Sequence, residues 1–168
     1  MRNIIHIAYS GMGGMAEAAL TLLAAAGSPK NRHQVLFYGR DKLAPANAEK
    51  CENLEVCFKY VEKGTGFDLG STRSIAAWLR EEKPDLILAH MTQTIFACFW
   101  YRFWHPRSRL VVIEHHSNAL KSAQDWVLTA LNHWAADHTI YLTPEYRDQV
   151  KKKLGILVRD SRLSVIPN

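Results

Sequence analysis

The segment from Ile4 to Gly27 limits the possible folds more than any other part of the chain. It opens with a nearly continuous apolar run at Ile4, Ile5, Ile7 and Ala8, as expected of a strand buried on both faces of a parallel sheet. A glycine-rich turn follows, and from Met15 apolar residues recur at helical spacing until Gly27 and Pro29 end the pattern. A strand that passes through glycines directly into a helix is typical of α/β folds.

The turn itself, Gly11-Met12-Gly13-Gly14-Met15-Ala16, matches the pattern G-x-G-x-x-G/A. The first N–H groups of a helix lack partners within the helix, and its dipole is positive at this end, so the turn suits a phosphate or another anion. Two interpretations stay open. The turn binds a ligand, or its glycines serve only to let the helix pack closely on the strand.

The remaining chain repeats the alternation of strand and helix. Further strands are predicted at His33–Gly39, Leu54–Val61, Asp85–His90, Leu110–Glu114, Thr139–Thr143 and Leu163–Ile166. Ser71 or Thr72, Thr92 or Thr94, and Thr143 are expected to cap helices, and residues 40–53 are expected to be irregular with at most a short helix. We therefore predict one Rossmann-like α/β domain over residues 1–168, with a mostly parallel sheet of about seven strands and helices on both faces in three layers.

The amino-acid composition limits which binding partners and which cellular compartment are expected. Lys and Arg number 21 against 16 Asp and Glu, and the resulting charge of +5 favours anionic partners. The three cysteines show no C-x-x-C spacing, which predicts neither a disulfide framework nor a metal site and fits the cytoplasm. The N-terminus reads as a strand rather than a signal peptide, and no apolar run approaches the ~20 residues that span a bilayer. Scattered basic residues alone do not indicate a nucleic-acid partner.

Four features of the sequence together resemble a known family. They are the opening strand with its Gly13-Gly14 turn, a strand ending at His90, a strand ending in Glu114-His115, and the final Ser-Val-Ile-Pro-Asn. This order resembles the N-terminal half of a retaining glycosyltransferase of family 4 with the GT-B fold. The resemblance implies that residues 1–168 are the acceptor-side domain and that the C-terminal, donor-binding domain is absent from this sequence.

The resemblance also implies roles for particular residues. The enzyme would transfer a hexosyl group, with retention, from a nucleotide diphosphate sugar such as a UDP- or GDP-sugar to a hydroxyl of a glycan or lipid-linked saccharide, without a metal or another cofactor. Its implied place is the cytoplasm of a bacterium, in the synthesis of cell-envelope polysaccharide. The expected sites are Gly13, Gly14 and Met15 for the donor diphosphate, His115 and His116 for catalysis, and Ser10, His90 and Glu114 for the acceptor.

The stretch from Phe96 to Arg109 combines aromatic rings with arginines. The favoured interpretation is a core helix, whose buried face would carry Ile95, Phe96, Phe99, Trp100, Phe103 and Trp104. The second interpretation is a segment that contacts an anionic membrane peripherally at its inner face. The next predicted helix has its apolar side at Leu120, Ala123, Trp126, Val127, Ala130, Leu131 and Trp134.

Two other functions fit parts of the sequence. A dinucleotide-binding oxidoreductase would use the glycine turn, with Gly39-Arg40-Asp41 after the second strand to contact the ribose. However, the Val-Ile-Pro-Asn ending of the sequence has no role in such an enzyme. A flavodoxin-like interaction module without catalysis is the other alternative.

Overall fold

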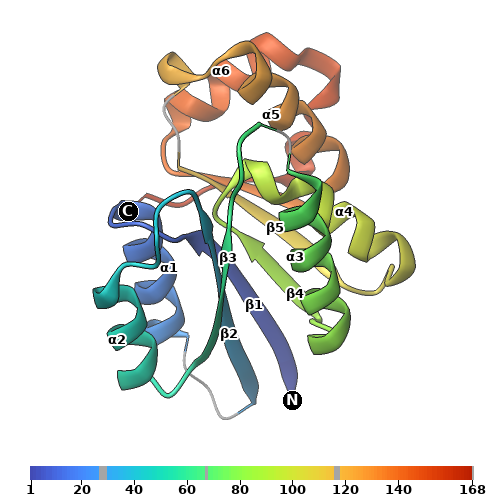
Figure 1. Ribbon diagram of the computed structural model, residues 1–168. Coiled ribbons are helices and arrows are strands. Elements are labelled where there is room, and N and C mark those ends of the chain that lie inside the picture. Colours follow the sequence, from blue (N-terminus) through green and yellow to red (C-terminus); the bar gives the residue numbers. More distant parts are fainter. Residues whose placement is uncertain (27–29, 67, 116–117, 168) are drawn as a thin grey trace.

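The computed structural model describes residues 1–26, 30–66, 68–115 and 118–167. Within these ranges strands and helices alternate as predicted (Figure 1). The strands are β1 (Arg2–Tyr9), β2 (Asn31–Gly39), β3 (Cys57–Glu62), β4 (Leu86–Ala89), β5 (Arg109–Glu114), β6 (His138–Tyr141) and β7 (Leu163–Val165). The α-helices are α1 (Gly14–Ala25), α2 (Pro45–Asn53), α3 (Leu69–Glu82), α4 (Ile95–Trp104), α5 (Ala123–Ala135) and α6 (Pro144–Leu154).

The seven strands form one sheet in the order β3-β2-β1-β4-β5-β6-β7, and every neighbouring pair is parallel. The predicted α/β class and strand number are therefore confirmed. The chain leaves β1 toward β2 and β3 and then returns to the other side of β1 as β4. Such a reversal opens a crevice at the carboxyl ends of the strands, where α/β sheets of this kind bind ligands.

Helices cover the two faces of the sheet in separate groups (Figure 1). Ala16, Ala19, Leu20 and Leu23 of α1 pack with Cys51 of α2 on one face, against apolar residues of β1 and β2. On the other face, α3, α4 and α5 pack against β1, β2, β4 and β5 around a larger core. The first face is less completely covered across β4, β5 and β6, where Leu88, Val111 and Ile140 are half-buried.

Residues 40–53 are more regular than predicted. Pro45 begins the nine-residue helix α2, because its fixed φ suits a first helical position. Cys51, the fully buried residue of α2, packs into the core beside α1. The helix also displaces the start of the third strand from Leu54 to Cys57, with Glu55 in the left-handed region at φ 53°.

The predicted cap of α3 is wrong by one turn. Asp68, not Ser71 or Thr72, is the N-cap, and its carboxylate accepts hydrogen bonds from the N–H groups of Ser71 at 3.0 Å and Gly64 at 2.6 Å. These bonds, that from Ser71 first, hold the pKa of Asp68 below its usual range. The Thr143 cap of α6 is confirmed, and α5 is closed by a capping box between Ser122 and Asp125.

The buried face of α4 differs from the one that the sequence predicted, except at Ile95. Ile95, Ala97, Cys98 and Tyr101 lie in the core, whereas Phe99, Trp100, Phe103 and Trp104 are exposed. The helix is apolar around most of its circumference, so periodicity could not choose a face. Small side chains at Ala97 and Cys98 let α4 approach α3 and the sheet closely.

The predicted face of α5 is also largely wrong. Leu128, Thr129, Asn132 and His133 are buried, while Leu120, Val127 and Trp134 are exposed. Two of the buried polar residues have partners in the interior: His133 Nε2 lies 2.6 Å from the Tyr141 hydroxyl, and the Thr129 hydroxyl donates to the carbonyl of Asp125. A helix that buries polar groups in this way has no clear apolar stripe in its sequence.

The Asp68 cap predicts a measurable stability difference. Asp68→Ala should lower the free energy of unfolding measurably, because the first N–H groups of α3 lose their acceptor. Asp68→Asn should cost much less, since an amide oxygen still accepts the bond from Ser71. Urea unfolding of the two variants measures both values, and equal losses would contradict the assignment of the cap.

Candidate functional site

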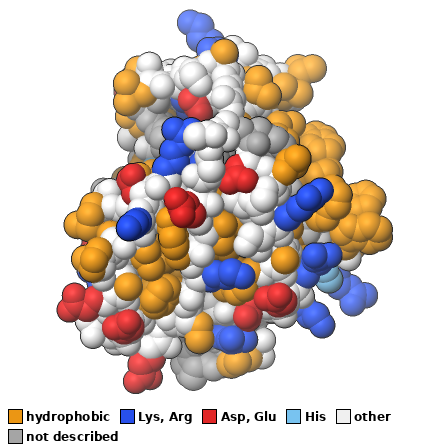
Figure 2. Space-filling model, viewed as in Figure 1, with side chains coloured by type: hydrophobic (Ala, Val, Ile, Leu, Met, Phe, Trp, Pro, Cys, Tyr) orange, Lys and Arg blue, Asp and Glu red, His pale blue; other side chains and the backbone are white. Residues whose placement is uncertain are grey.

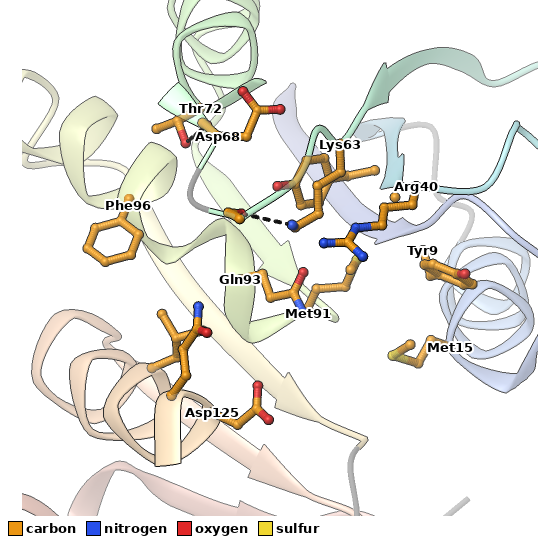
Figure 3. A pocket seen from close by; sticks show the side chains of 15 residues that line it. Tyr9, Met15, Arg40, Lys63, Asp68, Thr72, Met91, Gln93, Phe96 and Asp125 are labelled. Carbon is orange, nitrogen blue, oxygen red and sulfur yellow. Dashed lines mark hydrogen bonds between the residues drawn. The ribbon is translucent and has the colours of Figure 1, made fainter. Parts of the chain in front are cut away.

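A cleft of about 540 Å³ opens at the carboxyl edge of the sheet. It is lined by residues that follow β1, β2, β3 and β4 and by the starts of α1, α3, α4 and α5 (Figure 3). Among its lining residues are Tyr9, Met15, Arg40, Lys63, Met91, Gln93 and Phe96. Because all strands are parallel, their carboxyl ends meet at this single edge.

Two cationic side chains line the cleft, and only one of them is already hydrogen-bonded within the described part of the protein. Arg40 directly follows β2, is exposed, and has no hydrogen-bond or ion-pair partner within the described ranges. Lys63 directly follows β3 and donates to the carbonyls of Gly64 at 3.3 Å and Gly66 at 3.1 Å. Figure 3 shows both side chains extending into the same part of the cleft. Arg40 is therefore available to an anion that enters.

Other polar residues that line the cleft come from helix starts. Asp68 and Asp125 are both engaged in capping, of α3 and α5 respectively. Gln93 lies between these helices, at the turn that leads into α4 (Figure 3). The cleft thus offers cations for phosphate and neutral or anionic oxygens for hydroxyl groups, a combination suited to a phosphorylated sugar.

The predicted anion turn lies at the same edge. Gly13 adopts φ 148°, a conformation that glycine permits, and α1 starts at the next residue without a side-chain cap. A Cβ added at Gly14 would meet nothing within 4 Å. The first N–H groups of α1 thus have no side-chain acceptor, and Met15, one of the three residues predicted to hold the donor diphosphate, lines the cleft.

The structure brings His90 and His115 together. They follow the neighbouring strands β4 and β5, and His90 Nδ1 lies 3.1 Å from His115 Nε2, so that one ring donates and the other accepts. His90 is buried, and burial, followed by the nearby His6 and His115, lowers its pKa to about 3. His90 is therefore neutral at physiological pH and fixes the orientation of the half-buried His115 ring. Neither histidine lines the cleft itself.

A second pair of histidines, which the sequence analysis overlooked, lies beneath this one. His6 of β1 is fully buried, its Nε2 lies 3.3 Å from His33 Nδ1, and its ring stacks on His90 at 5.8 Å between centroids. Burial first, and His33 second, lower the pKa of His6 to about 3. Four imidazoles thus form a row from β2 through β1 to the ends of β4 and β5. Because side chains alternate between the two faces of a strand, the positions of these histidines along their strands could have indicated that they share a face.

Ser10 and Glu114, both predicted to contact the acceptor, are buried and have partners within the protein. The Ser10 hydroxyl donates to the Asp41 carbonyl at 2.7 Å, which holds the segment after β2. Glu114 forms an ion pair with Lys121 at 3.3 Å, with each side chain only 2% exposed. The proposed contacts of Ser10 and Glu114 with an acceptor stay predictions, and in this structure both residues anchor loops at the strand ends.

The Glu114–Lys121 pair affects the titration of its neighbours. Burial lowers the pKa of His133 to about 4, with the positive charge of Lys121 as the second cause. Burial, with Glu114 as the second cause, raises the pKa of Tyr141. Lys121 is held against Glu114, the last residue of β5, by this desolvated charge interaction.

His116, the second predicted catalytic residue, lies outside the described residues. Within the described ranges, no group of three or more His, Cys, Asp or Glu side chains is arranged to hold a metal ion. In the same ranges none of the helices has both the length and the apolar character needed to cross a bilayer.

The histidines predict a loss of stability in acid. An unfolded histidine takes up a proton near pH 6.5, whereas His6 and His90 do so only near pH 3 in the fold, so between these values the unfolded state binds more protons. The free energy of unfolding should therefore fall as the pH is lowered from 6.5 toward 3. Each histidine contributes a slope that reaches about 1.4 kcal/mol per pH unit once the pH is well below 6.5. Urea unfolding at several pH values measures this slope. It should become shallower in His6→Gln and in His90→Gln, and an unchanged slope in both would contradict the prediction.

The buried ion pair predicts non-additive mutations. Lys121→Met should lower the free energy of unfolding by about 3–5 kcal/mol, because the Glu114 carboxylate would stay buried without its cation. Adding Glu114→Gln removes that charge and should restore much of the loss. A double-mutant cycle measured by urea unfolding gives the coupling, and additive effects would show that the two side chains are not paired.

The fold is similar to that of several solved structures. HepE of Anabaena, solved in complex with UDP, aligns with a TM-score of 0.72 and 15% identity over 100% of this chain and 44% of its own. The lipopolysaccharide outer core galactosyltransferase WaaB aligns with a TM-score of 0.73 and 20% identity over 99% of this chain and 45% of its own. A UDP-GlcNAc 2-epimerase from Neisseria meningitidis aligns with a TM-score of 0.65 and 14% identity over 98% and 46%. At these identities the similarity concerns the fold, and the chain spans less than half the length of these proteins.

No curated protein sequence matches the chain significantly. The model of Glycosyltransferase Family 4 matches residues 12–168, which is nearly the whole chain and includes the turn before α1, the cleft-lining segments and His115. This match does not favour the oxidoreductase or the interaction module, and it confirms the family that the order of motifs suggested. The chain belongs to Glycosyltransferase Family 4.

Proposed function

We propose that this chain is the acceptor-side domain of a retaining glycosyltransferase that moves a hexosyl group from a UDP- or GDP-sugar to a hydroxyl of a glycan or lipid-linked saccharide. The observation that carries the proposal is the cleft at the β1/β4 reversal, which combines the uncapped start of α1 with the unpaired cation Arg40. The UDP in the HepE structure and the galactosyl transfer named for WaaB support it.

In the proposed reaction, the bond between the sugar C1 and the diphosphate breaks while C1 bonds to the acceptor oxygen, and the proton of the acceptor hydroxyl passes to a phosphate oxygen of the departing diphosphate. Negative charge grows on the departing diphosphate, and the N–H groups at Gly14 and Met15 would stabilise it because they are fixed at the start of α1 and no side chain caps them. His115 would contact the sugar at the reacting centre, with its ring oriented by His90. His116, Ser10 and Glu114 keep the roles proposed from the resemblance, and the reaction as proposed uses no metal or other cofactor.

A larger protein fits this proposal. Apolar residues at Leu88, Val111 and Ile140 are only half-buried in the middle of the sheet, where a further part of a longer chain would cover them. We propose that a C-terminal domain outside this sequence binds most of the donor and closes the cleft. We further propose that the enzyme acts in the cytoplasm, in synthesis of cell-envelope polysaccharide, with peripheral contact at the inner face of the membrane.

The start of α1 provides a sharp test in the full-length protein. Gly14→Ala has open space for its Cβ and raises helix propensity, so the fold should be as stable as before or more stable. Hexosyl transfer should nevertheless fall by at least about tenfold, because the methyl group would lie where the diphosphate approaches the backbone. Thr21→Ala, on the exposed side of the same helix, is the matched control and should retain activity.

The assay measures transfer from a panel of UDP- and GDP-sugars and determines the anomeric configuration of the product by NMR. Transfer with retention is expected, and His115→Ala should reduce it without loss of fold. Binding of NAD(P) with no affinity for nucleotide sugars, or full activity in both Gly14→Ala and His115→Ala, would contradict the proposal.

A further inference from the structure

Another groove, of about 470 Å³, lies across the first turn of α5 from the cleft. Gln124 and Asp125 line the cleft, whereas the next residue, Trp126, lines this groove, because successive side chains point to different sides of a helix. The proposed transfer reaction gives the groove no role. Its lining comes from the segment after β5 and from α5 and α6, at Asn118, Ala119, Trp126, Gln149, Lys152 and Lys153.

Lysines in the last turn of α6 make one wall of this groove positively charged. Residues 151–153 are three consecutive lysines. Lys151 pairs with Asp160 at 2.8 Å, whereas Lys152 and Lys153 are exposed and have no ion-pair or hydrogen-bond partner within the described ranges. Over the face shown in Figure 2, basic and acidic side chains are interspersed. The two lysines that line the groove are thus a local concentration of charge.

The half-buried indole ring of Trp126 positions one of these cations. Lys153 Nζ lies 3.9 Å from the ring centroid, which is the geometry of a cation–π contact. An ammonium group carries three N–H donors, and contact with a ring does not use all of them, so Lys153 can still bind an anion in the groove. The indole also offers apolar area, against which the C–H groups of a sugar ring can pack.

Asn118 adds a buried acceptor that lacks a donor. Its side chain is buried, and its Nδ2 donates to the Tyr146 carbonyl at 2.8 Å and to Gln149 Oε1 at 3.1 Å. These two bonds fix the orientation of the amide, and its Oδ1 has no hydrogen-bond partner among the described residues. A buried amide oxygen without a donor is unfavourable. The hydroxyl of a sugar that enters the groove is a donor of the required kind.

Two cations, an indole ring and an unpaired amide oxygen together match a sugar that carries an acidic group. We propose that this groove holds an acidic unit of the acceptor saccharide, while the hydroxyl that receives the hexosyl group lies in the cleft. A helix with its side chains is about 10–12 Å across, so a short oligosaccharide reaches from one side of α5 to the other. The choice of a saccharide rests on the proposed function, whereas binding in the groove requires no donor sugar.

The test is calorimetric titration of the full-length protein with four probes. Hyaluronan tetrasaccharide carries carboxylates and glucose 6-phosphate carries a phosphate, whereas chitotetraose is a neutral chain and inorganic phosphate is an anion without a sugar. At least one of the two acidic sugars should bind at least about tenfold more tightly than chitotetraose and inorganic phosphate, because only these sugars combine the acid with a sugar ring. The one that binds identifies the acidic group.

Variants of the groove locate the binding. Lys153→Glu should weaken binding of the acidic sugar by at least about tenfold, because it replaces the cation with an anion. Trp126→Leu should weaken it several-fold, and Trp126→Phe should weaken it less, since an aromatic ring remains. Arg80→Glu is the matched control: it reverses another exposed cation in the last turn of a helix, α3, and should bind as the unchanged protein does.

Three results would overturn the inference: no binding of either acidic sugar, equally tight binding of chitotetraose or inorganic phosphate, or unchanged binding in both Lys153→Glu and Trp126→Leu. Circular dichroism shows whether each variant is folded. Hexosyl transfer to a neutral acceptor too short to reach the groove is measured in parallel, and Lys153→Glu should retain it. Absence of this transfer in the unchanged protein would count against the proposed function alone, because the titrations contain no donor sugar.

Discussion

Parallel pairing of the seven strands is the constraint on which the rest of the structure depends. It directs every strand end to one edge of the sheet, and the reversal between β1 and β4 opens that edge into a cleft. Arg40 and Lys63, 23 positions apart in the sequence, both follow strand ends, and they extend into one space for this reason. The uncapped start of α1 shares the same edge, so cations and backbone N–H groups converge without any long loop to position them.

Beneath this edge the sheet buries polar groups that a parallel sheet seldom carries. His6 and His90 are neutral because burial opposes their protonation, and their rings stack on each other. Glu114 and Lys121 are charged but paired. A desolvated pair contributes little net stability, yet it is costly to break, so it holds Lys121 against the end of β5. A rigid support of this kind is what a side chain at a reacting centre needs.

The α4 helix shows that an aromatic-rich composition does not by itself decide which face of a helix is buried. Six of its ten residues are aromatic, and a core helix was the favoured interpretation. The structure instead packs α4 through Ile95, Ala97, Cys98 and Tyr101, where the Tyr101 hydroxyl reaches the Pro84 carbonyl at 3.4 Å. Burying the smaller side chains lets the helix lie close to α3 and the sheet. The large rings on its other side are then left in solvent, next to Arg107 and Arg109.

The sequence by itself determined the α/β class, the strands to within a few residues, the helix cap at Thr143 and the family, because hydrophobic period and turn residues act locally. It also indicated that His90 and His115 share an edge, since both directly follow strands. Only the tertiary structure decided that Asp68 caps α3, that Ser10 and Glu114 are engaged inside the protein, and which faces of α4 and α5 are buried. Only the tertiary structure also showed that Arg40 and Lys63 line the cleft and that the ring of His6 stacks on that of His90. These outcomes depend on which side chains meet across strands and helices distant in sequence, and burial and pairing energies at such contacts outweigh local preference.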